Sequence, residues 1–105
     1  MCIRDSGKLS LEQLMNLVCE NPAKIFGIIG KGFIKEKYDA DFTIVDMNKV
    51  IEIKNDKIES KCGWSPFDGY KFKGTPVYTI INGDIKMKDG KIIGEPSGKP
   101  IKFED

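Results

Sequence analysis

The stretch TPVYTIINGDIKM, Thr75–Met87, decides the fold, because two runs rich in strand-forming residues meet at an Asn-Gly pair. Asn82 and Gly83 tolerate the positive φ that a tight two-residue turn requires. Apolar runs on both sides of such a pair predict a β-hairpin. Pro76 has no amide hydrogen, and we expect it near the start of its strand, where that loss is tolerable.

The segments on either side of this hairpin are also predicted to be strands. Asp89 and Gly90 supply a second tight turn, which leads into residues 91–93. Upstream, residues 41–47 (DFTIVDM) are almost continuously apolar, which predicts a strand buried on both faces. Residues 49–55 (KVIEIKN) alternate apolar and polar side chains, which predicts a separate strand with one buried face. The β portion is therefore expected to be a small antiparallel meander.

Helical signals come first in the chain. Ser10 followed by Gln13 three residues later is the capping-box pattern, which predicts the start of a helix. We expect Asn21 to cap a second, short helix with Pro22 at its first position, and Gly27 to end that helix in the left-handed conformation. The Asn-Pro pair should produce a kink between the two helices. The apolar positions of the two helices include Leu11, Leu14, Met15, Leu17, Val18, Ile25 and Phe26.

These patterns divide the chain into three regions. Residues 7–30 form a helical segment, and residues 31–105 form the strands and a tail rich in Gly and Pro, which is expected to wrap over the sheet as a coil. The first six residues, MCIRDS, match one reading frame of a sequencing adapter. We interpret residues 1–6 as an artefact and expect the true gene to begin upstream. An ordinary N-terminal tail is the alternative.

The composition excludes several classes of function. The 105 residues form one domain at most, and 17 basic and 16 acidic residues are interleaved, so no field of one sign attracts nucleic acid or an anionic membrane. The longest apolar run, IFGIIG, is too short to cross a bilayer. Three cysteines without a CxxC pair fit a reducing cytoplasm better than a disulfide framework or a thiolate zinc site. Histidine, the commonest metal ligand and general base, does not occur in the sequence.

Asp39, Asp41 and Asp46 are the most obvious cluster of candidate site residues. Asp39 and Asp41 lie two residues apart and would share one face of a strand, so a hard cation is conceivable there. A calcium loop fails, because Ile44 occupies the sixth position from Asp39, where the sharp turn needs glycine. We favour the interpretation that Asp39 and Asp41 cap a turn into the strand and that Asp46 caps its exit.

A catalytic nucleophile is equally hard to find. Cys19 lies on or near a helix face and is most simply a small buried hydrophobe. Cys62 has no histidine to activate it, and Lys61 beside it, a residue type that usually faces solvent, can lower its pKa only slightly. Ser65 lacks a base. We therefore assign no catalytic, cofactor-binding or metal-binding residue to this chain.

The stretch KCGWSPFDGY, residues 61–70, holds the only tryptophan. It could form an aromatic binding platform. We favour a structural turn with Trp64 and Phe67 packed inward, because each of these side chains buries a large area. Gly63 and Gly69 would permit the sharp turns that such a loop needs.

Three blocks of sequence together resemble the C-terminal end of the cyclic amidohydrolases. NPAKIFG (21–27) and DADFTIVD (39–46) are shared across that superfamily, including dihydropyrimidinases and allantoinases. SKCGWSPFDGYKFKG (60–74), followed by TIINGDI and GEPSGKPIKF, is most similar to the dihydroorotases of the larger bacterial and archaeal type. The resemblance covers Lys8 to about Phe103.

The resemblance implies an α+β fragment: the terminal helices of a (β/α)₈ barrel, then antiparallel strands of a small composite β-sandwich. The parent would be a cytoplasmic enzyme, in some cases a homo-oligomer, that hydrolyses or forms the cyclic amide of dihydroorotate in pyrimidine biosynthesis. In that family zinc ions activate the attacking water, and their ligands would lie upstream of Met1, so the fragment alone is expected to be inactive.

One further expectation follows from the resemblance, and two alternatives to it stay open. Trp64 and Phe67 would anchor the β-module against the barrel. The alternatives are a fragment of an allantoinase or dihydropyrimidinase, and a free-standing, non-catalytic β-module that binds a partner through its exposed sheet.

Overall fold

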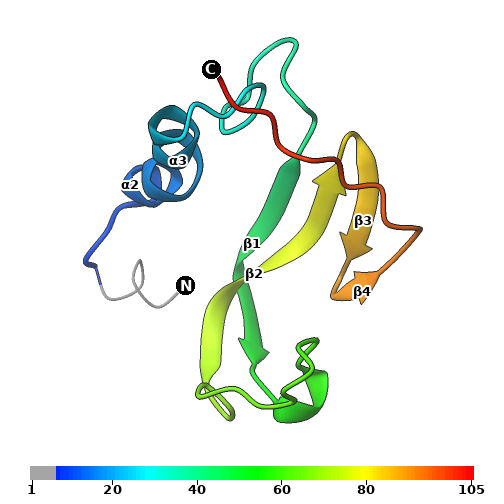
Figure 1. Ribbon diagram of the computed structural model, residues 1–105. Helices are drawn as coiled ribbons and strands as arrows, with labels where there is room; N and C mark the ends of the chain where they lie inside the picture. The colour runs from blue at the N-terminus through cyan, green and yellow to red at the C-terminus, as the bar shows by residue number, and fades with distance from the viewer. Residues whose placement is uncertain (1–6) are drawn as a thin grey trace.

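The computed structural model describes residues 7–105, so the six residues interpreted as adapter-derived lie outside the described part of the chain. Helical segments come first, and an antiparallel sheet with the strand order β1-β2-β3-β4 follows (Figure 1). This combination agrees with the expected α+β class. The elements are α2 (Leu11–Met15), the π-helical turn η1 (Asn16–Glu20), α3 (Asn21–Ile25), β1 (Phe42–Glu52), the 3₁₀ turn η2 (Asn55–Lys57), β2 (Lys71–Ile81), β3 (Asp84–Lys88) and β4 (Lys91–Ile92).

Helix α2 begins with the predicted capping box. The Gln13 amide donates a hydrogen bond to Ser10 Oγ at 3.1 Å, and the Ser10 amide donates one to Gln13 Oε1 at 2.9 Å. Each bond satisfies an amide that has no partner inside the helix. The start of the helical segment was therefore predicted correctly.

The predicted second cap is wrong. Asn21 keeps helical dihedrals (φ −62°, ψ −45°), and Glu20 occupies the cap position of α3. An ordinary α-helix would set the ring of Pro22 against the carbonyl four residues earlier, on Val18. The chain avoids this conflict with a π-helical turn, in which the Asn21 amide bonds to the Asn16 carbonyl five residues back. The helix widens at the proline and continues instead of stopping.

Gly27 ends α3 as predicted. Its φ of 60° is left-handed, and the Ile28 amide bonds to the Ala23 carbonyl at 2.8 Å. The Gly27 amide donates to the Lys24 carbonyl at 3.4 Å. These two bonds form the Schellman arrangement, which satisfies the last carbonyls of a helix.

The two strands predicted on either side of Asn48 are one strand, β1. Its register against β2 shifts between Asp46 and Val50, so a bulge bends the strand where an end was expected. Asp46 Oδ1 accepts hydrogen bonds from the amides of Asn48 at 2.9 Å and Lys49 at 3.2 Å. Asp46 therefore caps backbone amides as predicted, but it does so inside the strand.

Both predicted tight turns are present. Asn82 and Gly83, between β2 and β3, have φ values of 51° and 82°. Asp89 and Gly90, between β3 and β4, have φ values of 48° and 80°. The positive φ at all four positions explains why these residue types occur there.

Strand β2 begins earlier than predicted, at Lys71, so Pro76 lies in its interior. Two features make the missing amide hydrogen tolerable. The register against β1 shifts between Ile44 and Val45, and Val45 lies opposite Pro76. Strand β3 pairs with β2 only from Tyr78 onward, so the proline lies beyond the end of that ladder.

The apolar faces of the molecule are largely uncovered. Only Ala23 and Thr75 are buried among the described residues. The strand that was expected to be buried on both faces is not, since Phe42 is 37% and Ile44 47% exposed. The accessible surface of 8420 Å² exceeds the roughly 5900 Å² typical of a folded monomer of this mass. The described chain has too few layers to cover its own sheet.

The C-terminal tail is a coil, as predicted. It leaves β4 and returns to the loop after α3, where Ile28 and Phe103 form an antiparallel bridge (Figure 1). Within residues 7–105, no helix has the length and apolar character that crossing a membrane requires.

Candidate functional site

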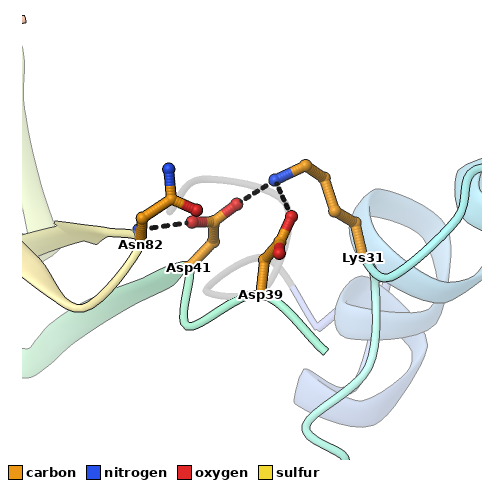
Figure 2. A network of polar contacts seen from close by, with 4 residues as sticks. All are labelled: Lys31, Asp39, Asp41 and Asn82. Carbon is orange, nitrogen blue, oxygen red and sulfur yellow. Dashed lines mark hydrogen bonds and ion pairs between the residues drawn. The ribbon is translucent and has the colours of Figure 1, made fainter. Parts of the chain in front are cut away.

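The best-connected polar group lies where the loop between α3 and β1 meets the turn between β2 and β3 (Figure 2). Lys31 Nζ donates to Asp39 Oδ2 at 2.9 Å and to Asp41 Oδ2. Asp41 Oδ1 accepts a hydrogen bond from the Asn82 amide at 2.8 Å. These four residues, which we call the polar junction, join three segments that are separate in the sequence.

The polar junction shifts the pKa values of two of its members. The hydrogen bond from Lys31 lowers the pKa of Asp41 below its ordinary value of 3.8, and the bond from the Asn82 amide lowers it further. The bonds to Asp41 and Asp39 raise the pKa of Lys31 above 10.5. Both groups stay charged at neutral pH, so the arrangement suits a structural ion cluster and not proton transfer.

The structure corrects the predicted roles of the two aspartates. Asp39 and Asp41 do lie together, and both point at one ammonium group (Figure 2). However, the Asp39 carboxylate binds Lys31, and Asp41 caps an amide of the β2–β3 turn, so neither caps a turn into β1 by its carboxylate. The cation between them is Lys31 itself. Sequence reasoning missed this lysine, whose partners lie eight and ten residues further along the chain.

Gly32, the neighbour of Lys31, allows this loop to pass close to the helical segment. Its φ is 88°, and an added Cβ would lie 2.5 Å from Ala23 Cβ and 2.8 Å from the Cys19 carbonyl oxygen. Any side chain at this position would overlap the helical segment. Gly32 therefore brings the loop into close contact with the helix and aims Lys31 at the sheet.

An open cavity of about 550 Å³ lies between the helical segment and the sheet. The charged members of the polar junction form its polar side, and their charges are already satisfied by one another. Because the rest of the wall is mainly apolar, the cavity suits packing of an apolar group and not recognition of a charged ligand. The apolar wall includes Met15, Val18, Ile28, Phe42, Ile80 and Ile81.

The loop of residues 61–70, which we call the aromatic loop, is held by side chains bonded to the backbone. Asn55 Oδ1 accepts the Ser65 amide at 2.8 Å, and the Asn55 amide donates to Asp68 Oδ1 at 2.8 Å. Ser65 Oγ accepts the Phe67 amide at 3.1 Å. Ser65 is thus a turn-forming residue.

The expected inward packing of Trp64 and Phe67 is wrong for this chain. Their side chains are 62% and 53% exposed. The Phe67 ring makes edge-to-face contacts with Tyr70 and Phe72, with 6.0 Å between ring centroids in each case. Tyr70 stacks on Phe72 at 6.1 Å. Phe67, Tyr70 and Phe72 contact one another at the far end of the sheet, where no described element covers them.

Two cysteines, Cys19 and Cys62, lie in the described part of the chain, and both are free thiols. Cys62 is exposed, its Sγ lies 2.9 Å from Ser60 Oγ, and it donates to the Trp64 carbonyl at 3.6 Å. The Ser60 hydrogen bond is the main cause of a lowered pKa of Cys62, and Lys61 is not among the causes. Cys19 lines the cavity and is only partly buried, which corrects the expected full burial.

Proteins similar to this chain fall into one family. The sequence profile described as the Amidohydrolase family matches residues 1–86. The dihydroorotase of Pyrococcus furiosus is 44% identical over 97 residues, which cover 92% of this chain and 23% of that protein. The allantoinase of Desulfitobacterium hafniense is 37% identical over 95 residues, which cover 90% of this chain and 21% of that protein.

The fold has a close counterpart among solved structures. The L-hydantoinase (dihydropyrimidinase) of Arthrobacter aurescens matches with a TM-score of 0.81 and 36% identity, over 87% of this chain and 20% of that one. This chain therefore spans only about a fifth to a quarter of the length of these relatives. Since the family profile matches most of its residues and its fold agrees with that of a solved relative, the chain belongs to the amidohydrolase family.

Proposed function

We propose that this chain is the C-terminal part of a dihydroorotase, a hydrolase that opens the cyclic amide of dihydroorotate or closes it from carbamoyl aspartate. The observation that carries the proposal is the 44% identity with the Pyrococcus furiosus enzyme over 92% of the chain. The allantoinase and the hydantoinase have lower identities of 37% and 36%. The order of these values favours dihydroorotate over the other cyclic amides.

In this proposal, residues 7–30 close a (β/α)₈ barrel and residues 31–105 form strands of the small β-sandwich beside it. The uncovered apolar faces of the helices and the sheet support this arrangement, because they are surfaces on which a larger body would pack. The aromatic loop would anchor the sandwich to the barrel through Trp64 and Phe67, which are exposed in the chain on its own.

Residues 7–105 do not fit the metal that the family implies. Among residues 7–105, no group of three or more His, Cys, Asp or Glu side chains could hold a metal ion. We therefore derive no catalytic step from this chain and propose that the zinc ligands belong to the remainder of the enzyme. The parent is proposed to be a cytoplasmic enzyme assembled from identical subunits.

A direct test uses the 105-residue chain alone. We expect no interconversion of dihydroorotate and carbamoyl aspartate with added zinc, cobalt or manganese, because the ligands for a catalytic metal are not among the described residues. We also expect the chain to bind a hydrophobic dye. Measurable turnover, or a chain that binds no hydrophobic dye, would contradict the proposal.

A chimera tests the assignment to dihydroorotase. Residues 8–104 would replace the matching C-terminal segment of the Pyrococcus furiosus dihydroorotase, and in parallel that of the Desulfitobacterium hafniense allantoinase. We expect the first chimera to be soluble and to keep dihydroorotase activity, and the second to assemble less well. The reverse result would favour the allantoinase alternative. The DNA directly upstream of Gly7 should encode a barrel with a His-x-His pair near its start. If it does not, both the dihydroorotase assignment and the allantoinase alternative are contradicted.

A further inference from the structure

The helical segment is positioned by connecting segments and not by packing of helices on strands. Among the described residues, the helices contact one another and the strands contact one another, without an extensive contact between a helix and a strand. A cavity of about 550 Å³ separates the two parts. Figure 1 shows the C-terminal tail crossing from β4 to the loop after α3, which places it to hold the two parts together.

One end of this tail is bonded to the loop that follows α3. The Ile29 amide donates to the Lys102 carbonyl at 2.9 Å, and the Glu104 amide donates to the Gly27 carbonyl at 2.7 Å. These bonds flank an antiparallel β-bridge. The end of the chain thus pairs with the backbone immediately after the helix, more than 70 residues earlier in the sequence.

The other end of the tail is bonded to β3. The Ile93 amide donates to the Lys86 carbonyl at 2.9 Å, and Lys86 Nζ donates to the Glu95 carbonyl at 2.8 Å. The Lys86 side chain is only 18% exposed, so this bond is partly sheltered from water. Between the two attachments, Pro96 and Pro100 restrict the backbone of the tail. The tail is therefore a span fixed at both ends.

We propose that residues 94–105 are a strap that holds the helical segment beside the open cavity, and that release of its Gly27 end lets the helical segment move and widens the cavity. Lys86 and Ile93 keep the other end on the sheet, so release is a local movement and not unfolding of the sheet. Only two backbone hydrogen bonds attach the strap to the loop after α3. Because so few bonds must break, this end of the strap should be released far more often than the whole chain unfolds.

The strap acts separately from the polar junction. The polar junction binds the loop between α3 and β1 to the β2–β3 turn, at the beginning of the sheet. The strap reaches the same loop from β3 and β4, at its helical end. A variant that weakens the strap therefore leaves the bonds of Lys31 and Asp41 in place. The contributions of the strap and of the polar junction to stability can thus be measured independently.

A cross-linking experiment tests the position of the strap. An added Cβ at Gly27 would lie 3.4 Å from Glu104 Cβ, close to the roughly 3.5–4.5 Å between the Cβ atoms of a disulfide. With all three native cysteines replaced, Gly27→Cys combined with Glu104→Cys should form a disulfide about tenfold or more faster than a control pair, because pairing raises the effective concentration of the thiols. The control is Gly30→Cys with Glu104→Cys, since Gly30 has a similar φ of 74° and no atom within 4 Å. Equal rates would overturn the proposal.

Thiol labelling tests whether the strap restrains the helical segment that lines the cavity. In a Cys2→Ser background, Glu104→Pro removes the amide that donates to Gly27, and Asp105→Pro is the matched control. Losing one backbone hydrogen bond should raise the maleimide labelling rate of Cys19, which lines the cavity, by about fivefold. The rate of Cys62, in the aromatic loop, should not change. An unchanged Cys19 rate, or an equal increase for both thiols, would overturn the proposal.

Discussion

The two ends of the ribbon formed by β1 and β2 are closed by different chemistry. At one end, the polar junction joins a loop, the start of β1 and the β2–β3 turn through charged side chains. At the other end, the aromatic loop is closed by neutral and charged side chains bonded to nearby backbone, while its rings stay exposed. One end is thus complete within the chain, and the other presents apolar surface that the chain leaves uncovered.

This difference indicates that the two ends have different structural roles. The polar junction has each of its charges paired over short distances, so it fixes geometry without help from another body. The aromatic loop has a satisfied backbone but an unsatisfied apolar surface, which is the condition of a docking element. Changes at the first end should therefore affect the stability of the chain itself. Changes to the rings at the second end should affect its assembly with a larger body.

The largest expected effect contrasts two glycines, one near each end. Gly32→Ala should destabilise the chain by about 3 kcal/mol, because the new Cβ overlaps Ala23 and the Cys19 carbonyl and the φ of 88° is also strained. Gly63→Ala in the aromatic loop is the matched control. Its φ is 66°, but no atom lies within 4 Å, so only the backbone strain of about 1 kcal/mol applies. Urea unfolding followed by circular dichroism measures both, and equal losses would contradict the close contact at Gly32.

A smaller effect contrasts two aspartates. Asp41→Ala should cost about 1–2 kcal/mol, because it removes a bond from Lys31 and a bond from the Asn82 amide. Asp68→Ala, in the aromatic loop, removes the acceptor of the Asn55 amide and should cost about 1 kcal/mol. The same urea titration measures both variants. A cost for Asp41→Ala that does not exceed that of Asp68→Ala would show that the polar junction contributes no more than an ordinary turn.

Local signals allowed much of the fold to be predicted. Ser10 and Gln13 predicted the start of the helix, and Asn82 and Gly83 predicted the hairpin turn. Each of these patterns acts within a few residues and can therefore be recognised in the sequence. The single strand β1 was missed, since Asp46 can cap the end of a strand or a bulge inside it with the same hydrogen bonds.

Long-range partners were the part that could not be predicted. Nothing near Lys31 in the sequence identifies Asp39 and Asp41 as its partners, because their meeting depends on the path of the whole loop. The exposure of Trp64 was missed for a related reason. Its large apolar area argues for burial, but the sequence does not say whether the covering surface lies within the chain.

The pH dependence of stability should isolate the polar junction. The folded-state pKa of Asp41 is lowered, so its contribution is present above the unfolded value near 3.8 and is lost as the pH falls through the lower folded value. The folded-state pKa of Lys31 is raised, so its contribution is present below 10.5 and is lost as the pH rises through the higher folded value.

Lys31→Met provides the comparison for this pH profile. This variant should flatten the dependence of the unfolding free energy on pH at both ends. The loss of stability at acid pH should become smaller, and the contribution of Lys31 that is lost at alkaline pH should be absent. Unfolding free energies measured from pH 2 to pH 11 test this expectation, with Lys61→Met in the aromatic loop as the control. If the two variants give the same profile, the ion pairs of the polar junction do not contribute to stability.

The smallest effect concerns the thiol of the aromatic loop. The Ser60 hydroxyl is the main cause of the lowered pKa of Cys62, so Ser60→Ala should shift the pH profile of its alkylation to higher pH. Because the group is exposed, the unfolding stability should stay close to that of the parent. Cys19 is the internal reference, since it lies beside the cavity at the other end of the molecule. A shift for both thiols would indicate a general change in structure, whereas a shift for Cys62 alone would show that the chemistry at this end is set locally, within the loop.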